Sequence, residues 1–223
     1  MIQKFYEVFL EEYKTLGPVT LGPLSSFDWR HDPRHVLFTL SRYKFCAKLL
    51  AGKKRVLEMG CGDGIGAPIL LQEVERVHGI DLEPQLIEDN MKRNPYPGRL
   101  TFECLDITEE SPFRRGMSDA ALATDVIEHI PVDRERNFME NTCLALVPNS
   151  ILILGTPNIT SQEYASQQSK EGHVNLKNHK GLKGLLSSYF HNVLLFSMSD
   201  EVIHTGYYPM AQYLFGVGIG KKT

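Results

Sequence analysis

Residues 56–66 read Val56-Leu57-Glu58-Met59-Gly60-Cys61-Gly62-Asp63-Gly64-Ile65-Gly66. This stretch decides the fold, because an apolar run that enters a glycine-rich turn and leaves as an amphipathic helix is typical of a nucleotide-binding βαβ unit. Glycine lets the backbone turn sharply with φ > 0, and it lets a ligand approach where a Cβ would collide. We therefore expect a nucleotide-like ligand beside this loop.

The loop alone leaves the identity of the ligand open. Residues 62–67 match the G-x-G-x-x-[GA] pattern of dinucleotide-binding domains, so NAD is one alternative. Three acidic residues weigh against it. Glu58 lies inside the end of the strand, before the first glycine. Asp81 follows the next apolar segment, where a carboxylate can accept both hydroxyls of a ribose. Asp106 follows a third segment, where a carboxylate can accept from an adenine amino group.

Together with Glu58 and the run Asp125-Val126-Ile127-Glu128-His129-Ile130-Pro131, this set resembles the class I S-adenosylmethionine-dependent methyltransferases. The resemblance runs from about Arg55 to the C-terminus and is nearest to the branch that contains the ubiquinone-biosynthesis O-methyltransferases. It implies S-adenosyl-L-methionine as cofactor, with its methionine part over the glycine loop, its ribose at Asp81 and its adenine near Asp106. The cofactor-binding residues that it implies are Glu58, Gly60, Cys61, Gly62, Gly64, Asp81, Leu82, Asp106, Ile107 and Asp125.

Strand and helix patterns alternate from Arg55 onward, which predicts an α/β fold with a parallel sheet and helices on both faces. With the resemblance, we expect a Rossmann-like, seven-stranded, mostly parallel sheet. Apolar segments at 193–197 and about 212–218 match the antiparallel hairpin that ends such a sheet. We divide the chain into an N-terminal helical cap, 1–54, and a cofactor-binding domain, 55–223. The cap has helices over 1–16 and from Pro33 to about 51, while the turn-rich stretch 19–32 receives no element.

Two histidines are candidates for catalysis. Ligands of open α/β sheets bind beyond the carboxyl ends of the strands, which places residues 125–129 and 156–158 at the reaction site. His129 is the leading general base, because the unperturbed pKa of histidine lies near neutrality. His173 lies in the long connection 155–178 and is expected to close over the acceptor. Packing of the loop explains either histidine equally well, and Glu128 is expected only to begin a helix.

No metal is assigned. A metal-dependent O-methyltransferase needs several carboxylates or amides that converge on one divalent ion. Asp125, Glu128 and Asn158 can be drawn in that way, but their spacing is not diagnostic. The four cysteines show no C-x-x-C spacing and the eight histidines no H-E-x-x-H pattern, so we expect reduced thiols in a cytoplasmic protein.

Charge and hydropathy limit the kinds of partner that the chain is expected to bind. No run of about 18 apolar residues occurs, so a membrane span is not expected. The net charge of −3 divides into +5 over residues 1–55 (10 basic, 5 acidic), −10 over 56–140 (8 and 18) and +2 over 141–223 (6 and 4). The acidic centre gives no support for nucleic-acid binding. The basic first quarter would attract an anionic small-molecule acceptor, although a solvated face is the simpler explanation.

Three functions are compatible with these patterns. The leading one is transfer of a methyl group from S-adenosylmethionine to an oxygen or nitrogen of a small molecule. The second is an NAD(P)-dependent oxidoreductase that uses the same glycine loop, and the third is a non-catalytic cofactor-binding module that regulates a partner. Quinol, sugar, amino acid and lipid headgroup are all compatible as acceptor, and the oligomeric state is left open.

Overall fold

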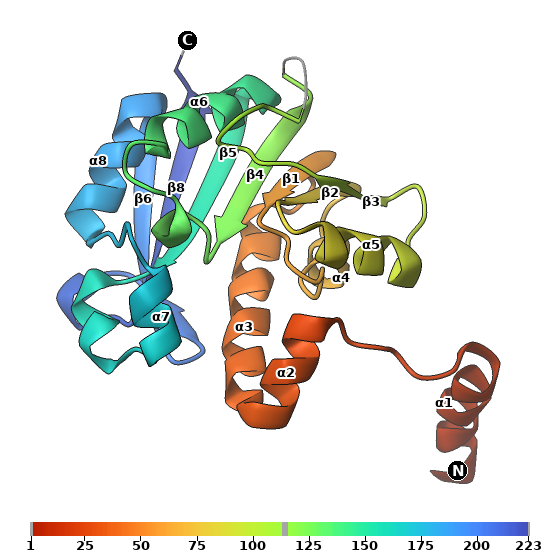
Figure 1. The fold of residues 1–223 in the computed structure, drawn as a ribbon. Helices are drawn as coiled ribbons and strands as arrows, with labels where there is room; N and C mark the ends of the chain where they lie inside the picture. The colour runs from red at the N-terminus through yellow and green to blue at the C-terminus, as the bar shows by residue number, and fades with distance from the viewer. Residues whose placement is uncertain (1, 113–115, 223) are drawn as a thin grey trace.

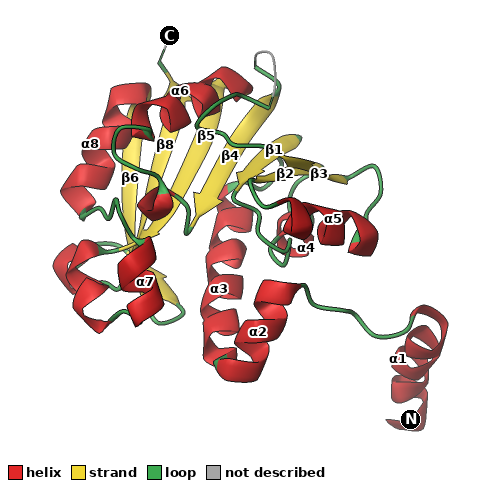
Figure 2. Cartoon of the chain, in the orientation of Figure 1, coloured by secondary structure: helices red, strands yellow, loops and turns green. Residues whose placement is uncertain are grey.

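The computed structural model describes residues 2–112 and 116–222 of the 223-residue chain. One mixed sheet runs through the molecule, with helices on both of its faces (Figures 1 and 2). Its strands are β1 (Arg55–Met59), β2 (Arg76–Asp81), β3 (Leu100–Cys104), β4 (Ser118–Thr124), β5 (Leu146–Pro157), β6 (Phe190–Ser199), β7 (Val202–His204) and β8 (Tyr213–Lys221). The α-helices are α1 (Ile2–Leu16), α2 (Pro23–His31), α3 (Pro33–Leu49), α4 (Ala67–Leu70), α5 (Pro84–Arg93), α6 (Glu135–Ala145), α7 (Gln167–Gly172) and α8 (His179–Tyr189). Three 3₁₀ turns lie at Ile127–His129, Ile159–Tyr164 and Tyr208–Met210.

The strand order is β3-β2-β1-β4-β5-β8-β6-β7. The first five of these strands pair in parallel, and β8, β6 and β7 pair antiparallel to their neighbours. The α/β class, the mostly parallel sheet and the antiparallel C-terminal pair are confirmed. The sheet has one strand more than the seven expected, because the three-residue β7 pairs with the outer edge of β6.

Alternate residues of the central strands face two separate apolar cores. Val56 of β1 faces the side covered by α3, α4 and α5, whereas Leu57 faces the side covered by α6 and α8. A parallel strand buried on both faces must be apolar throughout, which explains the continuous run before the glycine loop. Buried residues of α3, including Cys46 and Leu50, belong to the first core, and the division of the chain at residue 54 stays a prediction.

Three elements differ from expectation. The stretch 19–32, which received no element, contains α2. The apolar spacing from Ala67 to Val74 predicts one helix, but α4 ends at Leu70, and the turns after it are fixed by Arg99, whose Nη2 donates to the carbonyls of Leu71 (2.8 Å) and Val74 (2.9 Å). The sequence also predicts Asp133 as a helix N-cap, but α6 begins at Glu135 and no side chain caps its N-terminus.

The helix α1 stands apart from the other elements, joined to α2 by an extended segment (Figure 1). Its aromatic residues Phe5, Phe9 and Tyr13 are more than half exposed. Among the described residues, no helix is both long and apolar enough to cross a membrane.

Candidate functional site

The glycine loop follows β1 and passes close beneath the loop that follows β4. Gly60 has φ +66°, and a Cβ built there would lie 2.4 Å from Cγ2 of Val126. Gly62 has φ +53°, and its Cβ would lie 3.3 Å from Cδ1 of Leu24 in α2. Side chains at these two positions would fill the space between the loop and its neighbours, so the loop presents bare backbone to the space above it.

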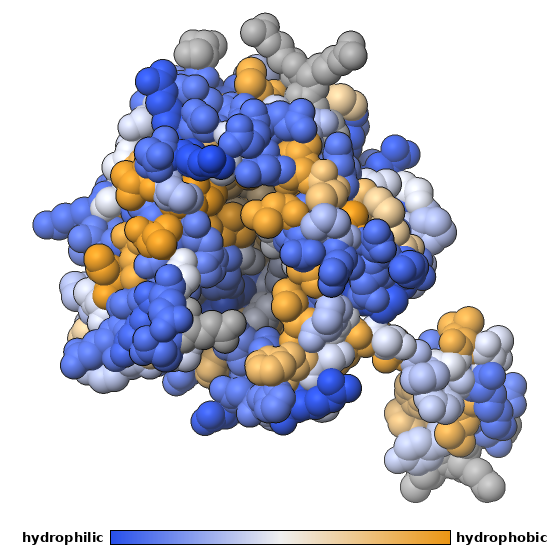
Figure 3. Space-filling model, in the orientation of Figure 1, coloured by the Kyte–Doolittle hydropathy of each residue, from blue (hydrophilic) through white to orange (hydrophobic). Residues whose placement is uncertain are grey.

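That space is a cavity of about 340 Å³ at the carboxyl ends of β1, β2 and β4. The surface of this face is hollowed at its centre, with apolar side chains at the rim (Figure 3). The residues that line the cavity include eight that the sequence assigns to the site: Gly60, Gly62, Asp81, Leu82, Asp106, Ile107, Asp125 and His129. Residues from four separate segments therefore meet around one volume, as parallel strands require.

Asp81 and Asp106 are held in place by backbone donors. The carboxylate of Asp81 accepts from the amide of Gly62 (2.9 Å) and from the amide of Glu83 (3.0 Å). Oδ1 of Asp106 accepts from the amide and the hydroxyl of Thr108, at 2.8 and 2.7 Å. Both acids thus lie fixed at the cavity wall and can accept further hydrogen bonds from a ligand.

Three residues implied as cofactor-binding do not line the cavity. Glu58 is 1% exposed and accepts a 2.6 Å hydrogen bond from the hydroxyl of Tyr43 in α3. Burial raises the pKa of Glu58 to about 7. Cys61 is buried beside Gly79 of β2, and Gly64 lies against Asn90 and Phe102. Glu58 lies behind the loop, Cys61 and Gly64 belong to it, and direct contact of these three residues with a cofactor stays a prediction.

Asp125 lies in a strained conformation at the end of β4. Its φ of +59° is rare for a residue with a side chain, and such strain is common at functional sites. Three contacts hold it there. Its carboxylate accepts from Nη1 of Arg42 (2.7 Å), and its amide donates to the carbonyl of Gly155 (3.1 Å) and to the hydroxyl of Tyr213 (3.2 Å). The Arg42 guanidinium lies 4.0 Å above the Tyr213 ring.

The sequence did not identify Arg42. It is one of several basic residues on the helix α3, and its partners Asp125 and Tyr213 lie far along the chain. No local pattern marks it, because only the packing of α3 against the sheet brings it to the site. Its burial lowers its pKa, but Asp125 and Tyr213 outweigh that effect, so the pKa is raised and the guanidinium stays charged.

Glu128 is buried, and only one of its two carboxylate oxygens has a hydrogen-bond partner among the described residues. Its Oε2 accepts from the hydroxyl of Thr156 (3.0 Å), while Oε1 has no hydrogen-bond partner among the described residues. Burial, and then the charge of Asp125, raise the pKa of Glu128 to about 8. Its carbonyl oxygen accepts from the amides of Val174 (2.8 Å) and Asn175 (3.0 Å), which ties the β5–α8 connection to the loop after β4.

That tie brings the two candidate histidines together. The ring centroids of His129 and His173 lie 5.1 Å apart. Nδ1 of His129 lies 3.0 Å from the carbonyl oxygen of Gly172, and a carbonyl only accepts, so this nitrogen carries the hydrogen. Nε2 of His129 then keeps its lone pair. Burial, and then His129, lower the pKa of His173, which favours the neutral ring.

Glu128, His129 and His173 each offer one ligand atom, and these atoms lie within 4.8 Å of one another. Two imidazoles and a carboxylate are a common donor set for a transition metal. From the sequence no metal is assigned, and the ligand set considered there contains Asn158 and neither histidine. Asn158 is not in the cluster, since its side-chain amide donates to the carbonyls of Tyr208 and Ala211. Glu128 and His129 are adjacent in the sequence, whereas His173 joins them only in the folded chain.

Comparison with known proteins agrees with this geometry. Residues 56–149 match the model of a methyltransferase domain. A ubiquinone biosynthesis O-methyltransferase of Xanthomonas axonopodis pv. citri (strain 306) is 25% identical over 140 residues, 62% of this chain and 57% of that protein. An 18S rRNA (guanine(1575)-N(7))-methyltransferase of Saccharomyces cerevisiae (strain ATCC 204508 / S288c) is 34% identical over 74 residues, 33% of this chain and 26% of that protein. The chain thus spans less than two thirds of either relative.

A solved structure shares the fold. The N-methyltransferase NodS from Bradyrhizobium japonicum WM9, in complex with S-adenosyl-L-homocysteine, superposes with a TM-score of 0.61 at 18% identity. The superposition covers 86% of this chain and 91% of NodS. Residues 56–149 thus carry a methyltransferase domain, and the strand order, the shared fold and the acid-lined cavity beside the glycine loop support the class I S-adenosylmethionine-dependent methyltransferase that the sequence resembles.

Proposed function

We propose that the chain transfers the methyl group of S-adenosylmethionine to an oxygen or nitrogen of a small-molecule acceptor. One observation carries the proposal. His129 lines the cavity of the glycine loop and also belongs to the cluster with Glu128 and His173, so the cofactor side and a proton-accepting group meet at one residue. Methyl transfer needs this juxtaposition, because the acceptor must lie in line with the methyl group and lose a proton.

The chemistry of the cavity fits the cofactor. Its lining includes Asp81, Asp106 and Asp125, of which Asp125 is paired with Arg42, and contains no lysine or arginine among the residues that the structure describes. When bound, S-adenosylmethionine supplies a methyl group on a positively charged sulfur, and it also carries an ammonium group. A carboxylate-lined cavity with bare glycine backbone suits both positive charges. We assign the ribose hydroxyls to Asp81, the adenine edge to Asp106 and the methionine end to the region of Asp125.

His129 is the proposed base. Its Nδ1–H donates to the Gly172 carbonyl, which fixes the ring and directs the basic Nε2 to accept a proton. His173 packs beside this ring, with the two ring centroids 5.1 Å apart, and burial and then His129 lower the pKa of His173. The buried Glu128 carboxyl completes the polar wall between the two rings and β5.

A second candidate follows from the same cluster. The unpartnered Oε1 of Glu128, with the two imidazoles, suits a divalent metal ion at the acceptor position. Such an ion would lower the pKa of an acceptor hydroxyl and replace the base. Dialysis against a chelator, followed by Mg²⁺, Mn²⁺ or Zn²⁺, separates the two mechanisms. Turnover that survives chelation supports the base, and turnover restored only by metal supports the ion.

The acceptor class is proposed from charge and from the relatives. Residues 56–140 carry 18 acidic and 8 basic residues, which disfavours wrapping of a nucleic acid around this part. By its name, one relative acts in ubiquinone biosynthesis as an O-methyltransferase, and another acts on 18S rRNA. A small phenol or quinol is therefore the first acceptor to test, and a structured RNA is the alternative that the same assay includes.

Two measurements test the function. In a thermal shift assay, S-adenosylhomocysteine at about 100 times its Kd should stabilise the chain by about 2.7 kcal/mol, and NAD should not. Radiolabelled S-adenosylmethionine is then incubated with phenols, quinols, sugars, amines, lipid headgroups and RNA. Stabilisation by NAD alone would support the oxidoreductase alternative. Binding of S-adenosylhomocysteine without labelling of any acceptor would support a non-catalytic module.

A further inference from the structure

The helix α2 lacks a cap of its own. Gly22 precedes it and has no side chain to accept from the free amides of the first turn. A helix of nine residues is marginal alone in water. Apolar burial adds little here, because Ser25 is its only buried residue, and Leu24, Phe27 and Trp29 are all more than half exposed.

The missing cap is supplied by Asp63 of the glycine loop, 38 residues along the chain. Oδ2 of Asp63 accepts from the amide of Ser25 (2.7 Å), and Oδ1 accepts from the hydroxyl of Ser25 (3.0 Å). Both residues are 4% exposed. A carboxylate at this position satisfies a first-turn amide and also complements the positive end of the helix dipole.

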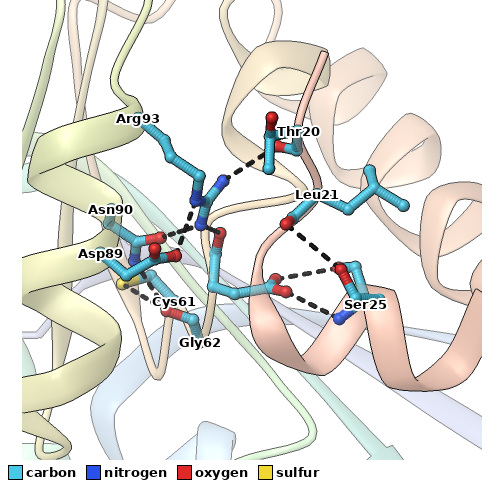
Figure 4. Close-up of polar contacts among 10 residues, drawn as sticks. Thr20, Leu21, Ser25, Cys61, Gly62, Asp89, Asn90 and Arg93 are labelled. Atoms are coloured by element: carbon cyan, nitrogen blue, oxygen red, sulfur yellow. Dashed lines mark hydrogen bonds and ion pairs between the residues drawn. The ribbon is translucent and has the colours of Figure 1, made fainter. Parts of the chain in front are cut away.

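Residues of α5 brace the contact from the other side (Figure 4). Nη2 of Arg93 donates to the carbonyl of Asp63 and to Oδ1 of Asn90, both at 3.0 Å. Nδ2 of Asn90 donates to the carbonyl of Gly62 (2.7 Å). The backbone of the loop is thus fixed by α5, and its one acidic side chain is left to hold α2.

The next step connects this cap to the cofactor. Leu24, the residue before Ser25, lies against Gly62 and lines the cavity with Gly60, Asp81 and Asp106. The side chain of Asp63 is not in the cavity lining. Docking of α2 by Asp63 therefore completes a wall of the cavity without direct contact between Asp63 and a ligand.

We infer that Asp63 is a positioning residue: it caps α2 from the glycine loop and thereby couples the order of residues 23–31 to occupancy of the cofactor cavity. The inference rests on the proposed function for the identity of the ligand. If α2 is docked for only a fraction of the time, the measured Kd of the cofactor rises by the inverse of that fraction. Loss of a helix cap shifts such an equilibrium by about tenfold.

Hydrogen exchange on the full chain tests the inference, with and without S-adenosylhomocysteine. In the wild type, the ligand should slow exchange of residues 23–31. In Asp63→Ala, exchange of this segment in the free chain should be about tenfold faster, and the Kd from calorimetry should be about tenfold higher. The strands β1 and β4 should keep wild-type protection. Asp63→Asn should keep most of the wild-type protection of residues 23–31 and most of the wild-type affinity, because an amide oxygen still accepts from Ser25.

Two adjacent serines give a matched control. Ser25→Ala removes only the hydroxyl donor to Asp63 and should show a smaller shift in the same direction. Ser26→Ala removes a hydroxyl that donates to the carbonyl of Leu21 and should change neither measurement. If Asp63→Ala also exposes the sheet, this pair decides the question.

Wild-type exchange of residues 23–31 in Asp63→Ala, a Kd within twofold of wild type, or equal effects of the two serine variants would each overturn the inference. Failure of the wild type to bind S-adenosylhomocysteine would instead refute the proposed function. In that case the exchange rates of the free chains still decide whether Asp63 caps α2.

Discussion

The two sides of the cavity are built over different distances along the chain. On the cofactor side, the Gly62 amide and the Asp81 carboxylate that it contacts are 19 residues apart and belong to one βαβ unit. On the acceptor side, Arg42 and Asp125 are 83 residues apart, and His129 and Gly172 are 43 apart. A local motif therefore builds the first side, while the second exists only when α3, the loop after β4 and the β5–α8 connection have come together.

This contrast predicts which property each side controls. Changes on the cofactor side should act on cofactor affinity, and changes on the acceptor side should act on turnover. The following variants test that division.

The largest effect is expected for Gly62→Val, which should abolish measurable binding of S-adenosylhomocysteine. A β-branched residue is strongly disfavoured at φ +53°, and its side chain would enter the space between the loop and Leu24. Calorimetry measures the affinity. Gly98→Val is the control, since Gly98 has φ +84° but no atom within 4 Å of its Cβ position. Strain alone would make the two variants alike, and normal binding by Gly62→Val would show that the loop is not part of the site.

On the acceptor side, His129→Asn should lower kcat by roughly 10²–10⁴-fold while cofactor affinity stays nearly unchanged, as expected for a lost general base. His173→Asn should raise the KM of the acceptor together with any fall in kcat, because His173 lies on the connection that covers this side. Steady-state kinetics with the true acceptor distinguishes the two. Near-normal turnover by both variants would mean that proximity alone drives the reaction.

Asp81→Ala should weaken cofactor binding about tenfold, because a charge-assisted contact to two hydroxyls is lost. Its control is Asp119→Ala. Asp119 also accepts from two backbone amides, those of Lys54 and Arg55, both at 2.9 Å, but at the opposite end of β1. Calorimetry should show a change only for Asp81→Ala, while thermal unfolding should show a loss for both. Equal affinities would remove Asp81 from the cofactor site.

The smallest effect concerns Glu58, which lies behind the glycine loop. Its folded-state pKa of about 7 exceeds the ordinary value of 4.5, so the folded state binds more protons between these values. The free energy of unfolding should therefore fall as pH rises from about 4.5 through 7, by at most on the order of 3 kcal/mol from this group. Glu58→Gln should flatten this slope in urea unfolding. An unchanged slope would place the proton elsewhere, for example on Glu128, whose raised pKa acts in the same direction.

The same division explains what the sequence could predict. The mostly parallel sheet, its antiparallel C-terminal pair and the glycine loop follow from periodicity and a recognised motif, and the resemblance implies the positions of Asp81, Asp106 and Asp125. The helix α2 does not, because its cap lies in another element and its sequence begins with Gly22-Pro23. The juxtaposition of His129 with His173 depends on two amides of the β5–α8 connection that donate to the Glu128 carbonyl, which no local pattern shows.

The glycine-loop motif could not predict the orientation of the Glu58 side chain either. Strand alternation turns Glu58 to the α3 side, where its carboxylate accepts from the Tyr43 hydroxyl, and its contact with the cofactor stays a prediction. Arg42 and Tyr43 are adjacent in α3. Arg42 contacts Asp125, which follows β4, and Tyr43 contacts Glu58 in the neighbouring strand β1. These two contacts depend on how α3 packs against the sheet, so the spacing of residues in the sequence could not predict them.

The carboxylate of Asp81 can accept only a limited number of hydrogen bonds, set by its lone pairs. Two ionised oxygens offer about four acceptor positions. The amides of Gly62 and Glu83 occupy two of them in the ligand-free chain, one on each oxygen. Two positions remain, which is the number that the vicinal hydroxyls of a ribose donate. A phosphate in place of one hydroxyl would bring an acceptor to an acceptor, so in its proposed role Asp81 would disfavour nucleosides phosphorylated on the 2′ or 3′ oxygen.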